Sequence, residues 1–189
     1  MPGVADLIDK PSLFDCRRVL CVQPHPDDME IGWGGTIARL TDAGVEVIYL
    51  SVTDDAAGLS GADAELPYAE RVRLRKEEQE KAASLLGVSQ LHWLGLPDAG
   101  DWSSYRAREK IVDLIRRIVP DAVATVDPWL RYEAHGDHRK TGLAAAEAEE
   151  PRESVPRAEG RLVDWAASPF AGSLAVGAAL VAAFVAVEL

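Results

Sequence analysis

Two short segments of the chain concentrate histidine and aspartate. The first reads HPDD at residues 25–28, and the second reads HGDH at residues 135–138. Imidazole and carboxylate are ligand types that suit zinc, and three protein ligands with one open position are the arrangement of catalytic zinc sites. The two segments therefore indicate a catalytic metal site, if the fold brings them together.

The adjacent acids of the first segment, Asp27 and Asp28, indicate two different roles. Neighbouring carboxylates repel each other unless a cation offsets the repulsion. One carboxylate can then bind a divalent metal while the other accepts a proton from a water molecule, whose pKa zinc lowers from roughly 15.7 to about 7. The spacing alone does not decide which aspartate has which role.

The elements that position these segments follow from the alternation of apolar and amphipathic stretches. This alternation predicts βαβ units and a Rossmann-like α/β fold, with a mostly parallel sheet and helices on both faces. Strands are expected at residues 17–23, 45–53, 91–96 and 122–128, and helices at 29–44, 68–87, 103–119 and within 132–150. Gly44, Gly87 and Pro120 are expected to stop the first three helices. The carboxyl ends of parallel strands share one edge of a sheet, so the two histidine-containing segments can converge there.

A glycine cluster, GWGGT at residues 32–36, follows the first segment. It does not match the dinucleotide-binding pattern G-x-G-x-x-G, and the preceding acids would repel an anion. We expect Gly32, Gly34 and Gly35 to permit close packing of a helix on the sheet. A nucleotide-binding Rossmann protein remains an alternative, which would be stabilised by a dinucleotide and indifferent to chelators.

Composition limits the class of protein and its partners. A chain of 189 residues with 48% hydrophobic content can bury one sizeable core. The net charge of -11 does not favour nucleic acid or an anionic membrane, and a small neutral or cationic substrate fits better. Two cysteines, Cys16 and Cys21, are too few for a disulfide scaffold. The first residues also lack an apolar stretch of signal-peptide length, so a cytoplasmic location is expected.

The character of the chain changes after Glu150. Residues 151–161 are charged and proline-containing, as in a linker, and residues 171–187 form an uncharged apolar run. As a helix this run would span roughly 25 Å, short of a hydrocarbon core of about 30 Å, so we expect it to pack on the domain or on a partner. A C-terminal membrane anchor is the alternative. We therefore expect a domain at 1–150 and an atypical tail at 151–189, and homo-oligomerisation stays open.

The motifs carry a family resemblance. PHPDDMEIGWGGT together with DPWLRYEAHGDHRKTG resembles the PIG-L/LmbE-like family of zinc-dependent N-acetylglucosaminyl de-N-acetylases, and most of all its diacetylchitobiose deacetylase-type members. The resemblance extends from about Arg18 to about Glu147 and includes RLRKEEQEKAASLLGV and LGLPDAG. Members of the family generally continue past the second motif, so the resemblance implies a domain that is short at its C-terminal end.

The resemblance implies a role for each residue of the two segments. It implies that zinc is bound by His25, Asp28 and His138. It implies that Asp27 is the general base, that His135 faces the oxyanion and protonates the departing amine, and that Asp137 orients the His135 imidazole and holds it charged. A donor aimed at a developing oxyanion is commonly worth about 3 kcal/mol of barrier.

Substrate contacts are expected from three further residues. Arg75 matches a family arginine near the substrate, Asp98 lies in the loop after the third strand, and Tyr132 lies beside the second motif. Glu133, next to Tyr132, could also touch substrate. The function expected is removal of the N-acetyl group from a GlcNAc-type sugar, such as a chito-oligosaccharide or GlcNAc conjugate, with release of acetate. The alternative is a folded metal- or sugar-binding remnant that is inactive because its C-terminal region is truncated.

Overall fold

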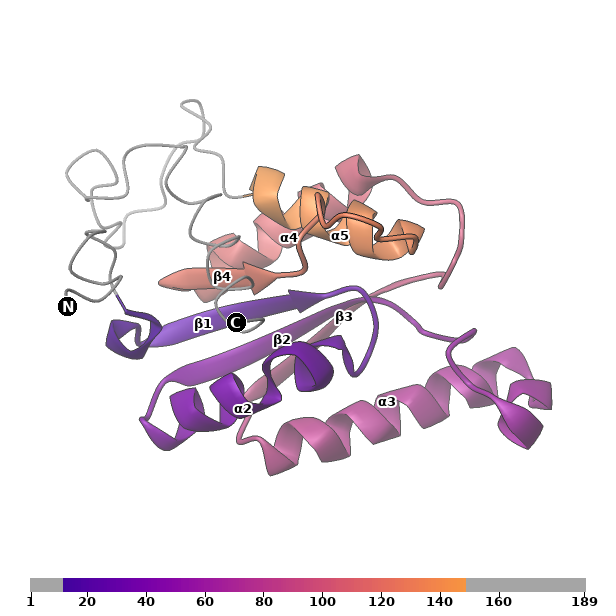
Figure 1. The fold of residues 1–189 in the computed structure, drawn as a ribbon, viewed down its shortest axis with the longest axis horizontal. Helices are drawn as coiled ribbons and strands as arrows, with labels where there is room; N and C mark the ends of the chain where they lie inside the picture. The colour runs from indigo at the N-terminus through magenta and orange to yellow at the C-terminus, as the bar shows by residue number, and fades with distance from the viewer. Residues whose placement is uncertain (1–11, 149–189) are drawn as a thin grey trace.

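Four apolar segments form a parallel sheet. The computed structural model describes residues 12–148. In them β1 (Arg18–Gln23), β2 (Glu46–Thr53), β3 (Gln90–Leu96) and β4 (Ala122–Thr125) are all parallel, in the order β3-β2-β1-β4 (Figure 1). This confirms the predicted α/β class. The strand order reverses between β1 and β4, and open α/β sheets bind ligands at the carboxyl ends of the strands at such a point.

Helices cover both faces of the sheet. α2 (Asp28–Asp42) and α3 (Tyr68–Leu85) lie on one face, and α4 (Ser104–Ile118) and α5 (Gly136–Ala148) lie on the other (Figure 1). Short 3-10 helices, η1 (Leu13–Asp15) and η2 (Gly61–Glu65), complete the described elements. Because successive strand residues point to opposite faces, Val19 and Cys21 pack with α2, whereas Leu20 and Val22 pack with α4 and α5. Burial on both faces explains why β1 and β2 read as continuous apolar runs.

The predicted helix stops are confirmed at two glycines. Gly44 after α2 and Gly87 after α3 have φ of +87° and +73°, in the left-handed region that glycine adopts readily. α4 ends differently, because Val119 itself adopts φ +52° immediately before Pro120. A β-branched residue is strained in this region.

The prediction for the fourth strand was too long. β4 ends at Thr125, paired with Val22 near the end of β1, rather than at residue 128. An ideal Cβ built at Gly142 in α5 would lie 2.5 Å from the Val126 carbonyl oxygen, so the chain here runs directly against the helix.

The packing role predicted for the glycine cluster was wrong for Gly34 and Gly35. Both lie within α2, and among the described residues nothing lies within 4 Å of an ideal Cβ at either position. Gly142 in α5 does permit close approach of a helix, because an added Cβ would also lie 2.9 Å from Pro128 Cδ.

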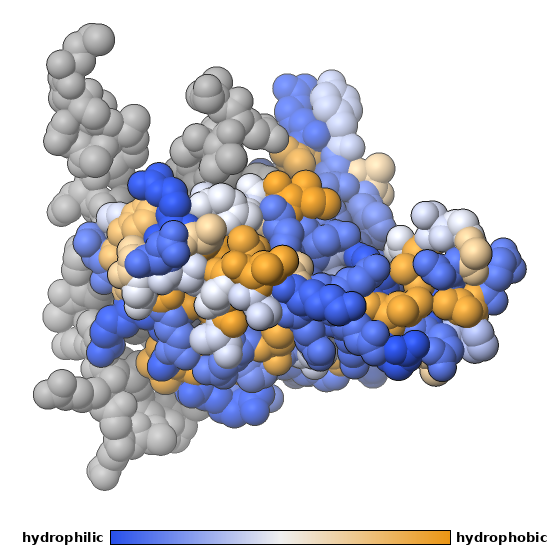
Figure 2. Space-filling view, turned by 90° about the horizontal axis from the view of Figure 1, so that it is seen from below, coloured by the Kyte–Doolittle hydropathy of each residue, from blue (hydrophilic) through white to orange (hydrophobic). Residues whose placement is uncertain are grey.

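The surface over α2 and α3 is mainly hydrophilic, with hydrophobic residues in separate patches (Figure 2). Only Gln79 and Ala83 of α3 are buried, so the charged residues of this helix form a solvated face. Within residues 12–148, the helices are all too short or too polar to cross a membrane. The tail predicted at 151–189, its apolar run at 171–187 and the domain boundary at 150 lie outside the described residues, so these stay predictions.

Candidate metal centre

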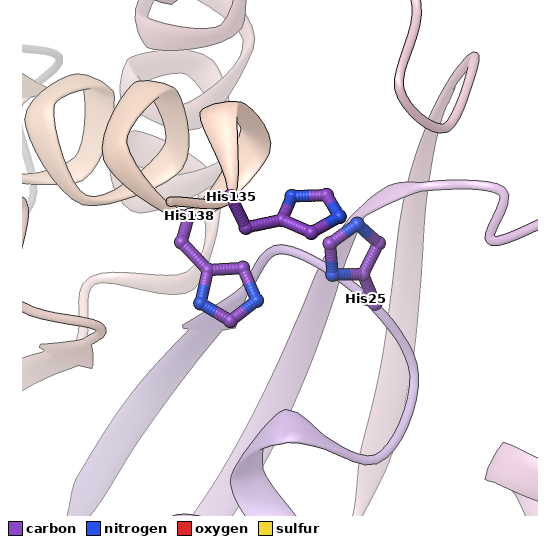
Figure 3. Close-up of side chains that lie close together, drawn as sticks. All are labelled: His25, His135 and His138. Carbon is purple, nitrogen blue, oxygen red and sulfur yellow. The ribbon is translucent and has the colours of Figure 1, made fainter. Parts of the chain in front are cut away.

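Three histidines meet at the carboxyl ends of β1 and β4. His25 lies on the loop after β1, and His135 and His138 project toward it from the start of α5 (Figure 3). Ring centroids are 4.6 Å apart for His25 and His135, 5.3 Å for His25 and His138, and 5.1 Å for His135 and His138. One nitrogen from each ring lies within 4.8 Å of the others. The two sequence segments therefore converge, because β1 and β4 are neighbours in the sheet.

Asp28 connects two of these histidines. Its Oδ2 lies 3.3 Å from His25 Nδ1, and its Oδ1 lies 3.4 Å from His138 Nε2. Two donors that each bind zinc at 2.0–2.1 Å in a tetrahedron lie about 3.3 Å apart. These two distances run to different oxygens of Asp28, and the donor types of His25, Asp28 and His138 suit a divalent metal ion. Within residues 12–148, two other groups of close donors could also hold a metal: His25 with His135 and His138, and His25 with Asp98 and Asp137.

The nitrogen of each ring that faces away from Asp28 meets another carboxylate. His25 Nε2 lies 3.1 Å from Asp98 Oδ1, and His138 Nδ1 lies 3.1 Å from Glu133 Oε2. Metal-binding histidines usually donate their second N–H to a carboxylate or carbonyl, which fixes the tautomer and ring orientation. Asp98 was predicted to contact substrate, and Glu133 was noted as a neighbour of the second motif; both contact the histidines in the structure. The Asp98 side chain is only 5% exposed.

Charge around His25 favours its protonated form while no metal is bound. Burial lowers the pKa of His25, but the hydrogen bond with Asp28 and the charges of Asp28, Asp98 and Asp55 outweigh burial and raise this pKa to about 9. For Asp28 burial raises the pKa, and the contacts with His25 and His138 more than offset it, so the pKa is lowered. The carboxylates around His25 therefore favour a positive charge at this site.

Asp27 adopts a strained backbone conformation. It is the residue before α2, with φ 86° and ψ -21°, and its side chain makes no capping hydrogen bond to the helix. The carboxylate is half exposed and accepts a hydrogen bond of 2.8 Å from Arg75 Nη2. Arg75 also donates to Asp55, Glu78 and the Pro26 carbonyl. Its guanidinium is thus engaged by four protein groups.

Asp137 meets His135 through its backbone rather than its carboxylate. The Asp137 N–H donates to His135 Nδ1 at 3.3 Å. The buried carboxylate of Asp137 instead accepts from the Ala99 N–H at 2.7 Å and pairs with Lys140 Nζ at 2.7 Å. An imidazole that accepts at Nδ1 can donate from Nε2. The role that the resemblance implies for Asp137 beside His135 stays a prediction.

A cavity of about 290 Å³ opens beside His135. It is lined by Ala99, Ala134, His135, Gly136, Asp137 and Lys140. Tyr132 is 94% exposed on the loop between β4 and α5. Lys140 was not anticipated from the sequence, although its i,i+3 spacing from Asp137 on a helix is a recognisable signal.

Comparison with known proteins relates both the sequence and the fold to deacetylases. Residues 20–149 match the family described as GlcNAc-PI de-N-acetylase, PIG-L. The chain is 43% identical over 134 residues to diacetylchitobiose deacetylase of Thermococcus kodakarensis. This alignment covers 71% of this chain and 49% of that protein. The chain thus spans about half the length of this relative.

Two solved structures share the fold. N,N'-diacetylchitobiose deacetylase from Pyrococcus horikoshii is 44% identical, with a TM-score of 0.67 over 71% of this chain and 49% of that chain. A 4-carboxy-2-hydroxymuconate hydratase from Pseudomonas putida is 25% identical, with a TM-score of 0.60 over 70% of this chain and 55% of that chain. The second similarity shows that this fold also carries a reaction other than deacetylation.

Proposed function

Because the chain belongs to the GlcNAc-PI de-N-acetylase (PIG-L) family, we propose that it is a metal-dependent hydrolase that removes the N-acetyl group from a GlcNAc-type sugar. The observation that carries this proposal is the spacing of 3.3 Å and 3.4 Å from Asp28 to His25 and His138. The substrate class is supported by a relative of over 40% identity that is named a diacetylchitobiose deacetylase.

We assign the metal to His25, Asp28 and His138 and propose that it is zinc. A bound zinc ion would polarise the acetyl carbonyl and lower the pKa of a coordinated water. Asp98 and Glu133 would hold the two imidazoles with the correct nitrogen toward the ion, because each accepts a hydrogen bond from the other ring nitrogen.

Asp27 is the proposed general base. Its carboxylate is half exposed and follows directly from the loop that carries His25, so it can reach a water molecule beside the site. It accepts the proton from the attacking water, and that proton is available for the departing amine. Arg75 holds the carboxylate through its hydrogen bond of 2.8 Å.

His135 is the proposed donor to the oxyanion. The Asp137 N–H occupies Nδ1, which leaves Nε2–H free to donate to the carbonyl oxygen as charge develops there. In this assignment His135 acts as a neutral donor. The substrate contacts predicted for Arg75, Asp98 and Tyr132 stay predictions, and only Tyr132 is widely exposed.

The proposed activity is tested with zinc-loaded protein by measuring acetate release from diacetylchitobiose and GlcNAc. We expect Asp27→Asn to retain stoichiometric zinc and to lose turnover. Asp113→Asn, on the exposed side of α4, serves as the matched control and should behave as wild type.

Other outcomes would favour a different function. Stoichiometric zinc without acetate release from any acetamido sugar would favour the inactive remnant. Hydration of an unsaturated carboxylate without acetate release would favour a hydratase. Stabilisation by a dinucleotide with indifference to chelators would favour a nucleotide-binding protein.

A further inference from the structure

Asp27 has a positive φ of 86°, which non-glycine residues adopt rarely, although aspartate adopts it more often than most. A non-glycine residue in a sparsely populated region costs on the order of 1–3 kcal/mol and persists only where the surrounding structure determines it. The constraint comes from α3, because the Asp27 N–H donates to Gln79 Oε1 at 2.9 Å. Gln79 is 2% exposed and lies one helical turn after Arg75, which binds the carboxylate of the same aspartate.

The orientation of the Gln79 amide is fixed by the Asp27 N–H. Its Nε2 donates to Glu30 Oε1 at 2.7 Å. A backbone N–H only donates, so the amide oxygen must face the Asp27 N–H and the amide nitrogen then faces Glu30, whose pKa is raised by burial. The same oxygen also accepts from Gln23 Nε2 at 3.2 Å.

Gln23 caps α2 in place of Asp27. A residue at the position of Asp27 ordinarily caps a helix by accepting from the N–H two or three residues on. Here Gln23 Oε1 accepts from the Met29 N–H at 3.0 Å, and the Asp27 carboxylate makes no capping bond. Gln23 is fully buried and is held by its hydrogen bond of 2.9 Å to Ser51 Oγ in β2.

We propose that Gln23 and Gln79 are positioning residues that hold the Asp27 backbone in its left-handed conformation and relieve its carboxylate of capping α2. The carboxylate is thereby free to act as a base at the metal centre. This inference rests on the proposed function for Asp27 alone, since neither glutamine contacts the predicted metal ligands in the hydrogen bonds described above.

The first test compares Gln79→Met with Gln90→Met in the full-length zinc-loaded protein. Methionine keeps a similar volume but removes the acceptor for the Asp27 N–H, whereas Gln90 is exposed at the opposite end of β3. We expect Gln79→Met to lower kcat for diacetylchitobiose by about 10²-fold, because misplacement of a catalytic group by an ångström has an effect of this size. KM and zinc content should stay at their wild-type values, and Gln90→Met should retain wild-type kcat.

The second test is a rescue. Gln79→Glu places a carboxylate against Glu30 and should lower kcat, whereas Gln79→Glu combined with Glu30→Gln restores a donor and an acceptor and should recover most of it. A kcat for Gln79→Met equal to that of Gln90→Met, or a double variant no more active than Gln79→Glu, would overturn the proposal. A rescued variant that loses zinc and does not recover kcat would also overturn the proposal.

A third measurement does not depend on activity. The Asp27 amide should be protected from hydrogen exchange in the wild-type protein and should exchange faster in Gln79→Met, which lacks the acceptor, than in Gln90→Met. Absence of wild-type acetate release would refute the proposed function, whereas equal exchange in all variants would refute the role of Gln79.

Discussion

Gly142→Ala should destabilise the protein although alanine favours helices. In an unconstrained helix interior this substitution stabilises by about 1 kcal/mol. At Gly142 the added Cβ would lie 2.5 Å from the Val126 carbonyl oxygen, 2.9 Å from Pro128 Cδ and 3.0 Å from Pro128 N. Contacts with backbone cannot be relieved by a rotamer change, and overpacking typically costs about 1–3 kcal/mol. The net expectation is a loss of up to about 2 kcal/mol in the free energy of unfolding, because an overpacking cost of about 1–3 kcal/mol is offset by the helix gain of about 1 kcal/mol.

Gly35→Ala is the matched control. Gly35 also lies inside a helix, is exposed, and has no atom of the described residues within 4 Å of an ideal Cβ, so alanine there should stabilise by about 0.5–1 kcal/mol. Urea unfolding of the metal-free variants measures both free energies. Because Gly142 abuts the loop that leads to His135, zinc affinity should fall for Gly142→Ala and not for Gly35→Ala. Equal stabilisation by the two alanines would refute the packing argument.

Three further predictions concern separate parts of the structure. Glu133→Ala should weaken zinc binding by about tenfold or more, because it removes the acceptor for His138 Nδ1, and Glu109→Ala should not; chelator competition measures both affinities. Val119→Gly should stabilise the protein by about 1 kcal/mol in thermal or urea unfolding, since it relieves the left-handed strain at the end of α4, and any loss of stability would contradict this. In metal-free protein the pKa of His25 should be near 9 by NMR titration. Because this pKa is raised above its ordinary value of 6.5, protonation of His25 stabilises the metal-free fold fully below about pH 6.5, and the stabilisation is lost as the pH rises through about 9. A titration near pH 6.5, or one unchanged by zinc, would contradict the arrangement.

The sequence predicts the sheet and the meeting of the two motifs because both depend on strong regular signals. β1 and β2 are buried on both faces, so their apolar runs are continuous. Parallel strands bring their carboxyl ends to one edge, which places His25 and His138 close together whatever the side-chain details. The left-handed glycines Gly44 and Gly87 mark helix ends for a similarly local reason.

The partners of individual polar side chains could not be predicted in this way. Gln23 and Gln79 are 56 positions apart and neither belongs to a histidine-aspartate motif, yet their amides are bonded to each other in the core. Glu133 lies close to His135 in sequence, but its Oε2 contacts His138, and only the start of α5 decides which imidazole it meets. The sequence around Gly142 does not indicate its packing role either, because the Val126 carbonyl that lies against it belongs to a different part of the chain.

Backbone strain is concentrated at the edge of the sheet that holds the metal centre. Among residues 12–148, five non-glycine residues have positive φ: Asp27, Asp55, Ala99, Val119 and Tyr132. All but Val119 lie on the loops that follow β1, β2, β3 and β4, one on each loop. Local propensity favours glycine, asparagine or aspartate at such positions, so Asp27 and Asp55 fit it, whereas Ala99 and Tyr132 do not. Contacts with helices constrain two of these loops: Gln79 of α3 accepts from the Asp27 N–H, and the Asp137 carboxylate of α5 accepts from the Ala99 N–H. The first contact holds the proposed base, and the second involves a carboxylate that lies 3.6 Å from His25 Nε2. The geometry of the site and the conformations of its loops are therefore determined together, and neither can be read from one segment of the chain alone.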